Sequence, residues 1–337
     1  MRLVVLTKYF GLNYTGATAA TQQLVARWQE NVDKIEVMTL HLGSCLDFDE
    51  GVVKIEVFPN VLALRRRLRE LGGADGYYSD DHLGTMLRGK YPFVHTYHGS
   101  WPAARWQSVK TFVQSLYFMP RYERIFKTCD AVVNVSRRSE RYTNIFTHRS
   151  IVIHNGIMDL PASVERSAGN MRIMVVGSVC RWKYGHLVPV AKRIYELCPD
   201  VIIHVYGNIV ERELADELSM LPNVVLKGFC SKPPFWNYGV LMCTSSSENL
   251  PISICEALAC GIPVVSFNVG GISEVVNEER GYLVRPFDSD ELAVKAIKAL
   301  GCDNWNINSE EVRREFSWER ASGRYLDLFA KLTGETK

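Results

Sequence analysis

The stretch SSSENLPISICEALACGIPVV (residues 245–265) carries the signals of a loop, a short helix and a buried strand. Pro251 suits the first helical turn, where the N–H that proline lacks is not needed. Apolar residues then recur at helical spacing, and a Gly-Ile-Pro sequence ends the helix before the VVSF strand. Glu248 is therefore expected on the loop before the helix, and Glu256 one turn inside it. The free amides of the helix N-terminus favour an anion between them, such as the phosphates of a ligand with hydroxyl groups at both ends.

A structural alternative explains the same residues without a ligand. Ser245 and Glu248 are spaced as a capping box, in which serine and glutamate side chains satisfy backbone amides at a helix start. Glu256 would then be a solvated residue on the outer face of the helix. Taken alone, this stretch leaves both interpretations open.

Length and cysteine content limit the class of protein. The 337 residues predict two domains of ordinary size. No run of about 18 apolar residues occurs, so no membrane-spanning helix is expected. The N-terminal MRLVVLTKYFG lacks a signal-peptide cleavage pattern and is typical of a first strand. The nine cysteines include no C-x-x-C pair, which favours reduced thiols in the cytoplasm over a disulfide framework or a zinc site.

Charge is distributed unevenly along the chain. Residues 1–168 carry about five more basic than acidic side chains, whereas the remainder carries about three more acidic than basic ones. The N-terminal half is therefore suited to an acidic partner. Nucleic acid is not expected as a partner, because no basic stripe interleaved with aromatic residues occurs.

Short apolar runs alternate with helical patterns in two successive series. Strands are predicted at 2–6, 34–40, 53–58, 93–98, 131–136 and 150–156, and again at 172–177, 201–207, 223–229, 238–246, 262–267 and 281–284. Such alternation is typical of parallel α/β sheets covered by helices. The polar segment 160–170 is a predicted linker. We expect domains at 1–165 and 166–316, followed by an amphipathic helix at 317–337 that packs across the domain junction.

The chain resembles the retaining glycosyltransferases of family four over nearly its whole length, most strongly between Val240 and Pro286. There, two glutamates separated by seven residues are followed by A-x-A-x-G-x-P-V-V and then by G-G, as in that family. The resemblance implies an α/β architecture called GT-B, in which two Rossmann-like domains have parallel sheets facing across a cleft. It also implies that the second domain binds a nucleotide-sugar donor and the first an acceptor.

The family suggests roles around the two glutamates. Glu248 would accept hydrogen bonds from hydroxyls of the donor sugar, and Glu256 from both ribose hydroxyls. A carboxylate suits a vicinal diol because it offers two acceptor oxygens. Backbone amides around the helix start would hold sugar and phosphate oxygens, and they belong to Asn249, Leu250, Ile252 and Ser253. This context favours the donor site over the capping box.

The leaving diphosphate requires positive charge, and no Asp-x-Asp motif is placed to hold a metal. We therefore expect no metal and no other cofactor. In the segment SVCRWKYGH, Lys183 stands at the lysine position of the family and Ser178 at its arginine position. Arg181, three residues further on, is the expected substitute. The alternative is that Arg181 and Lys183 are two solvated surface cations.

Several further positions match the family. Gly16 takes the second position of the glycine loop in the first domain, while Thr15 replaces the first glycine. His98, after a buried strand, is expected near the reacting side of the donor sugar, although a core histidine is the alternative. Gly228 and Phe229 are expected near the nucleotide base. Gly270 and Gly271 are expected either near the sugar or phosphate or in simple turns.

The resemblance predicts a cytoplasmic, metal-independent glycosyltransferase that retains anomeric configuration. A sugar-nucleotide epimerase of similar fold and a catalytically silent nucleotide-sugar binder are the alternatives. A UDP- or GDP-sugar is expected before an ADP-sugar, and the acceptor is a glycan, a lipid-linked or a small molecule. Residues 61–73 (VLALRRRLRELGG) predict a helix that either packs its leucines inward or also rests on anionic lipid at the inner membrane face.

Overall fold

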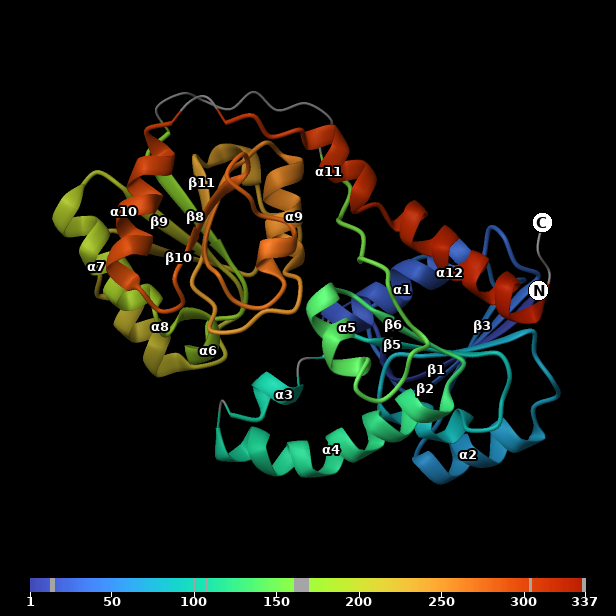
Figure 1. Cartoon of the computed structure of the whole chain (residues 1–337). Coiled ribbons are helices and arrows are strands. Elements are labelled where there is room, and N and C mark those ends of the chain that lie inside the picture. The colour runs from blue at the N-terminus through green and yellow to red at the C-terminus, as the bar shows by residue number, and fades with distance from the viewer. Residues whose placement is uncertain (13–15, 100, 107, 161–169, 303–304, 335–337) are drawn as a thin grey trace. The chain divides into compact units, whose positions relative to one another are not determined.

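The computed structural model describes residues 1–12, 16–99, 101–106, 108–160, 170–302 and 305–334. The chain divides into two compact units, one formed by Met1–Gly156 with Phe316–Lys337 and the other by Ile157–Glu315. The predicted domain boundary after residue 165, nearly all of the predicted linker, and Thr15 lie outside the described residues. Each unit is an α/β structure with a parallel sheet (Figure 1).

The first unit contains a seven-stranded sheet in the order β3-β2-β1-β4-β5-β6-β7. Every strand pair in it is parallel. Its strands are β1 (Arg2–Phe10), β2 (Lys34–Leu42), β3 (Val53–Val57), β4 (Gly76–Ser79), β5 (Phe93–Tyr97), β6 (Ala131–Asn134) and β7 (Ser150–Val152). All six predicted strands of this series are present. The seventh, β4, was not predicted, because four residues after Gly-Gly-Ala-Asp have the composition of a turn.

The position of β4 in the middle of the sheet explains its composition. It pairs with β1 on one side and β5 on the other. A Cβ atom on Gly76 would lie 2.7 Å from the side chain of Leu3 and 2.8 Å from that of Phe329. Glycine is therefore needed for close packing there, and burial of Tyr77 and Tyr78 stabilises a segment whose local sequence does not favour a strand.

Helices cover both faces of this sheet (Figure 1). On one face, α1 (Gly16–Trp28) and α12 (Trp318–Thr333) bury Trp28 and Tyr325. On the other, α2 (Val61–Glu70), η1 (His82–Leu87) and the second half of α4 (Val109–Thr128) bury Leu64, Leu87 and Phe126. The remaining helices of the unit are α3 (Trp101–Ala104) and α5 (Arg137–Thr143).

The predicted apolar face of α12 is confirmed. Trp318, Ala321, Tyr325 and Phe329 are buried, and Leu328 and Leu332 are partly buried against the same core. The rings of Trp28 and Tyr325 meet edge to face with centroids 5.7 Å apart. The helix is therefore an integral part of the first unit. That it also packs across the domain junction stays a prediction.

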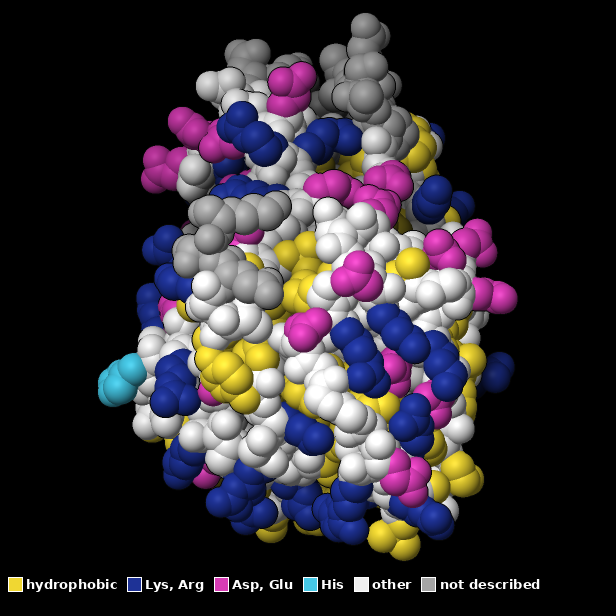
Figure 2. Space-filling view, turned by 90° about the vertical axis from the view of Figure 1, so that its right-hand side faces the viewer, with side chains coloured by type: hydrophobic (Ala, Val, Ile, Leu, Met, Phe, Trp, Pro, Cys, Tyr) yellow, Lys and Arg dark blue, Asp and Glu magenta, His cyan; other side chains and the backbone are white. Residues whose placement is uncertain are grey.

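The leucine side of α2 packs inward, as in the first of the two interpretations of residues 61–73. Leu64 and Leu68 are buried, whereas Leu62 is exposed. Arg67 pairs with Glu56, and Arg66 with Glu70. Figure 2, in which the right-hand side of Figure 1 faces the viewer, shows several Lys and Arg side chains along its lower edge.

The second unit contains a six-stranded parallel sheet in the order β10-β9-β8-β11-β12-β13. Its strands are β8 (Arg172–Val176), β9 (Ile202–Tyr206), β10 (Val224–Gly228), β11 (Val240–Cys243), β12 (Val264–Phe267) and β13 (Gly281–Val284). Its helices are α6 (Arg181–Tyr184), α7 (Leu187–Leu197), α8 (Arg212–Ser219), η2 (Phe235–Asn237), α9 (Ile252–Ala259), η3 (Ile272–Glu274), α10 (Ser289–Leu300) and α11 (Ser309–Glu315). All six predicted strands of the second series are confirmed.

The strand order reverses once in each sheet, between β1 and β4 and between β8 and β11. In open α/β sheets the loops at the carboxyl ends of two such strands diverge and leave room for a ligand. Each unit therefore has one place where a site is expected from topology alone. Within the described part of the chain, no helix is long and apolar enough to cross a membrane.

Candidate functional site

The helix α9 begins at Ile252, one residue later than the sequence signals indicated. Pro251 is at the N-cap position with an extended backbone, rather than in the first turn. No side chain caps this end of the helix. The capping box of Ser245 and Glu248 is therefore not formed, and the amides of the first turn have no side-chain acceptor there.

Lys183 and Glu248 form an ion pair at the strand-order reversal of the second unit. Lys183 follows β8 and Glu248 follows β11, and these two strands are neighbours in the sheet. The Lys183 Nζ atom donates to Glu248 Oε1 at 3.0 Å, and the two side chains are 21% and 10% exposed. Burial opposes the charged form of Lys183, but the charge and hydrogen bond of Glu248 outweigh burial and leave the pKa of Lys183 raised.

Backbone contacts hold the two loops together around this pair. The Thr244 hydroxyl donates to the carbonyl of Lys183 at 2.8 Å, and the Ser246 N–H donates to the carbonyl of Trp182 at 2.8 Å. Within the first loop, the Tyr184 hydroxyl donates to the carbonyl of Gly177 at 2.9 Å. The cation and the carboxylate are thus positioned by ordered backbone, as a preorganised site requires.

A third loop, after β12, packs against the Glu248 backbone. Gly270 has a φ of +67°, and a Cβ atom there would lie 1.6 Å from the carbonyl oxygen of Glu248. The N–H of Gly271 donates to the carbonyl of Asn249 at 2.9 Å. Gly270 therefore permits close approach to the Glu248 loop, and Gly271 adds a backbone hydrogen bond to the same loop.

Glu256 is buried in α9 and is not the solvated residue of the structural alternative. Its side chain is 5% exposed and accepts a hydrogen bond from the N–H of Met158. Burial raises the pKa of Glu256 to about 7, and the Met158 hydrogen bond offsets only part of this effect. A carboxyl group in this state both donates and accepts hydrogen bonds near neutral pH.

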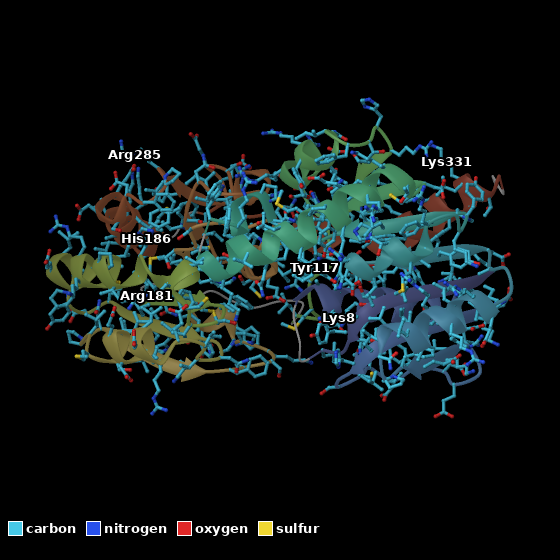
Figure 3. All side chains as sticks on the ribbon, turned by 90° about the horizontal axis from the view of Figure 1, so that it is seen from below. Lys8, Tyr117, Arg181, His186, Arg285 and Lys331 are labelled. Atoms are coloured by element: carbon cyan, nitrogen blue, oxygen red, sulfur yellow. The ribbon has the colours of Figure 1, made fainter. Side chains whose placement is uncertain are left out.

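Arg181 is directed away from the Lys183–Glu248 pair. Its guanidinium donates to Glu217 at 2.9 Å and lies 3.9 Å from Glu211, and these contacts with α8 and its preceding residue leave it about half exposed. Figure 3 labels Arg181 on the second unit. The structure therefore brings together Lys183 and Glu248 but gives Arg181 two other carboxylates.

The remaining predicted donor residues occupy loop positions in the second unit. Gly228 ends β10 with a φ of +73°, and Phe229 after it is exposed. The predicted amide donors between β11 and the first turn of α9 are all half-buried; they are Asn249, Leu250, Ile252 and Ser253. Their roles toward a ligand stay predictions.

In the first unit, His98 directly follows β5 and is partly buried. Burial lowers the pKa of His98 to about 4, so the imidazole is neutral at pH 7. Gly16 is exposed at the start of α1, and no atom lies within 4 Å of where its Cβ would be. This open space is a finding for the described residues, which exclude residues 13–15, and the predicted contact of Gly16 stays a prediction.

Sequence reasoning missed two aspartates at the strand-order reversal of the first unit. Asp80 and Asp81 follow β4, beside the end of β1. Asp80 accepts from the Thr21 hydroxyl at 2.5 Å, and Asp81 accepts from the N–H of Lys8. Burial, together with the charge of Asp81, raises the pKa of Asp80 to about 7, and burial raises that of Asp81 to about 6. Two acidic residues after a strand would have been the signal, had β4 been recognised.

Among the described residues, no group of three or more His, Cys, Asp or Glu side chains is arranged to hold a metal ion. Residues 170–302 match the family described as Glycosyl transferases group 1, and residues 16–158 match Glycosyltransferase Family 4. Together these segments cover most of the chain. The chain belongs to the group 1 (family 4) glycosyltransferases. The two matches fall on the two structural units, one on each.

Relatives in the glycosyltransferase family differ in how much they share with this chain. The alpha-maltose-1-phosphate synthase of Mycolicibacterium smegmatis is 26% identical over 310 residues, or 75% of this chain and 76% of that protein. An uncharacterized glycosyltransferase of Haemophilus influenzae is 25% identical over 206 residues, or 56% of this chain and 55% of that protein. The chain spans only 22% of the length of the probable sucrose-phosphate synthase of Thermosipho melanesiensis. It spans 44% of the N-acetylglucosaminyltransferase subunit GtfA of Streptococcus pneumoniae.

Solved glycosyltransferase structures share the fold over nearly the entire chain. HepE of Anabaena, solved in complex with UDP, has a TM-score of 0.76 at 16% identity, covering 98% of this chain and all of that one. The same protein has also been solved with UDP-glucose. The architecture of two parallel-sheet α/β units is therefore that of GT-B glycosyltransferases, as the sequence predicted.

Proposed function

We propose that this protein transfers a sugar from a nucleotide-diphosphate sugar to an acceptor hydroxyl, with retention at the anomeric carbon and without a metal. The observation that carries the proposal is the ion pair of Lys183 and Glu248 at the strand-order reversal of the second unit. It places one cation and one carboxylate beside a helix start that no side chain caps. Family membership makes glycosyl transfer the chemistry that such a site serves.

Lys183 supplies charge to the departing diphosphate. As the glycosidic bond breaks, negative charge builds on the phosphate oxygens, and a fixed ammonium in a largely buried site stabilises it. The first-turn amides of α9 add donors for phosphate oxygens. Glu248 keeps Lys183 charged and in place before the donor arrives, and it then accepts hydrogen bonds from sugar hydroxyls.

Glu256 holds the ribose in this proposal. Near neutral pH its carboxyl group exists in both protonation states, because its pKa is raised to about 7. Ribose hydroxyls are better donors to the ionised form, so nucleotide binding favours ionisation of Glu256. Arg181 can serve the diphosphate only if it leaves Glu217 and Glu211.

The first unit binds the acceptor, a glycan, a lipid-linked or a small molecule. His98, Asp80 and Asp81 follow neighbouring strands of its sheet and offer a neutral imidazole and two carboxyl groups to hydroxyls. Retention is proposed on the family resemblance, through attack from the face that the diphosphate leaves. A cytoplasmic location is supported by the cysteine content, because the nine cysteines include no C-x-x-C pair and fit reduced thiols.

The donor is a UDP- or GDP-sugar, with UDP supported by the complexes of HepE. The test is thermal unfolding with a panel of UDP-, GDP- and ADP-sugars. A ligand at 100 times its dissociation constant stabilises the protein by about 2.7 kcal/mol, so one base should stand out. Turnover of that donor is then measured with acceptors, by following the anomeric configuration of the product, with and without EDTA.

Each outcome of this test distinguishes the proposal from its alternatives. Transfer with retention that survives EDTA supports it. Conversion of the donor sugar without acceptor would indicate an epimerase, and binding without any turnover a silent nucleotide-sugar binder. Loss of transfer in EDTA that magnesium restores would overturn metal independence alone, and an inverted product would overturn retention alone.

A further inference from the structure

The first half of α4 has the pattern of a buried helix face, but this face is exposed. Apolar residues recur at positions i, i+3, i+4, i+7 and i+8, the spacing of a stripe that normally faces a core. These residues are Val109, Phe112, Val113, Leu116 and Tyr117, and their exposed fractions are 83%, 41%, 58%, 65% and 48%. We call them the α4 stripe. Five large apolar side chains on one exposed helix face exceed what scattered surface residues explain.

The α4 stripe is held in place by contacts on the other side of the helix. A capping box between Ser108 and Thr111 fixes the first turn. Phe118 stacks on Trp101 of α3 with ring centroids 5.0 Å apart, and Ser115 is buried. The second half of the helix is anchored by Phe126 in the core. The stripe is therefore an ordered surface of the first unit.

Aromatic and basic side chains extend this surface. Trp106, just before the helix, is 69% exposed, and its ring lies 5.9 Å from that of Phe112. The guanidinium of Arg105 lies over Trp106, and that of Arg121 lies over Tyr117. Figure 3, seen from below, labels Tyr117 on α4, which faces the viewer there. Tryptophan and tyrosine are the residues that favour the boundary between lipid and water.

The charge of this segment has one sign. Residues 101–128 contain one acidic residue, Glu123, against five basic ones: Arg105, Lys110, Arg121, Arg124 and Lys127. Arg124 and Lys127 are exposed and continue the outward side of α4 beyond the stripe. An apolar stripe that passes into a basic stripe on one helix matches an anionic bilayer surface, where acyl chains lie beneath negative headgroups.

We propose that the first unit docks on anionic lipid through the α4 stripe. The membrane contact that was one of two interpretations of α2 is thereby assigned to a different helix. In α2 the leucines at 64 and 68 are buried and two of the arginines are paired within the unit. Because α2 and α4 cover the same face of the sheet, the exposed Arg65 and Arg69 add charge to that side. A second copy of this chain is a poorer occupant, since two basic stripes would face each other.

The test is co-sedimentation of the full chain with vesicles of phosphatidylcholine alone or mixed with an anionic lipid such as phosphatidylglycerol. The parent should sediment with the anionic vesicles at low salt, and salt should release it. The double variant Val113→Ser, Leu116→Ser should bind at least tenfold more weakly, because two side chains no longer enter the bilayer. The triple variant Lys110→Ser, Arg124→Ser, Lys127→Ser should bind about 100-fold more weakly to anionic vesicles.

The matched control is Val210→Ser, Met220→Ser, which removes two apolar side chains from the second unit. They are 65% and 78% exposed, at least as much as Val113 and Leu116, and their loss should leave vesicle binding unchanged. All variants should keep nucleotide binding and thermal stability. Four results would overturn the proposal. The parent could stay in the supernatant with anionic vesicles at low salt, or the control could lose as much binding as the α4 variants. The parent could form a concentration-dependent dimer that the α4 variant abolishes, or the α4 variant could keep vesicle binding but lose stability. The last would mean that the stripe is covered within the folded chain.

Discussion

At the residue scale, a buried ammonium is costly unless an opposite charge is held against it, and Lys183 meets this condition through Glu248. We expect Lys183→Ala to lower turnover about 100-fold or more, because the departing diphosphate loses its fixed cation. Steady-state kinetics on the donor identified by the panel measure this effect. Lys192→Ala, an exposed lysine on α7, is the control and should be unaffected.

The Lys183 variant also leaves Glu248 without its partner, so lost structure must be separated from lost chemistry. Lys183→Arg keeps the charge and should recover part of the turnover that Lys183→Ala loses. If Lys183 were merely structural, turnover would recover only where the melting temperature also recovers. Equal turnover of parent and Lys183→Ala would remove Lys183 from the leaving-group role.

Glu256 makes stability depend on pH in a defined direction. Its pKa is about 7 in the fold against an ordinary value of 4.5, so the folded state holds the proton more tightly than the unfolded chain. The contribution of this group to the free energy of unfolding is fully present below pH 4.5 and is lost as pH rises through about 7. The total loss is about 3 kcal/mol. The Glu256→Gln variant does not lose this stability at higher pH, because glutamine does not ionise. The difference in free energy of unfolding between variant and parent should therefore grow from pH 5 to pH 8.

Urea denaturation of both proteins at several pH values measures this difference. Asp80 and Asp81 also titrate in this range, but they are present in both proteins and their contribution cancels. Parallel pH profiles for parent and variant would show that Glu256 ionises in the fold as it does in the unfolded chain.

At the element scale, α12 completes the core of the first unit, and Phe329 is one of the large side chains that it buries there. The ring is fully buried and packs against Trp28 and the position of Gly76. We expect Phe329→Ala to cost about 3–5 kcal/mol of unfolding free energy, because a large cavity is left in a close-packed core. Lys331→Ala, exposed on the same helix, is the control. Thermal unfolding monitored by circular dichroism should show a drop only for Phe329→Ala.

An unchanged melting temperature for Phe329→Ala would mean that α12 is dispensable for the first unit. Nucleotide binding gives a second readout, since the candidate donor site lies in the other unit and should persist where that unit stays folded.

Elements with strong local signals could be predicted from the sequence, and elements defined by tertiary packing could not. Twelve strands combine apolar runs with flanking turn residues, and all were found. The strand β4 depends on its neighbours, because Gly76 fits between Leu3 and Phe329 only in the assembled sheet. Asp80 and Asp81 were missed for the same reason. The local sequence of residues 245–265 predicted the loop, the helix and the strand. The ion pair of Glu248 could not be predicted in this way, because its partner Lys183 lies 65 residues away in the sequence.

At the scale of the whole molecule, each unit places its polar candidates where its strand order reverses. Lys183 and Glu248 follow β8 and β11 in the second unit. In the first unit Asp81 follows β4 and accepts a hydrogen bond from the N–H of Lys8, which lies near the end of β1. Topology therefore explains why the candidate residues of each unit come from distant parts of the sequence. Family resemblance found the second set more completely because Lys183 and Glu248 each lie in a sequence motif of the family, whereas Asp80 and Asp81 lie outside the motifs on which the resemblance rests.

The first unit is built from two separate segments, because the chain leaves it after Gly156 and returns at Phe316. During synthesis on the ribosome, the sheet of this unit therefore emerges long before α12. At typical elongation rates the intervening unit takes on the order of ten to thirty seconds to make, and throughout that time Trp28 lacks the cover of Tyr325 and Phe329. We therefore expect the nascent first unit to expose apolar surface until α12 is made, whereas the second unit, continuous in sequence, can close its own core as soon as it is made.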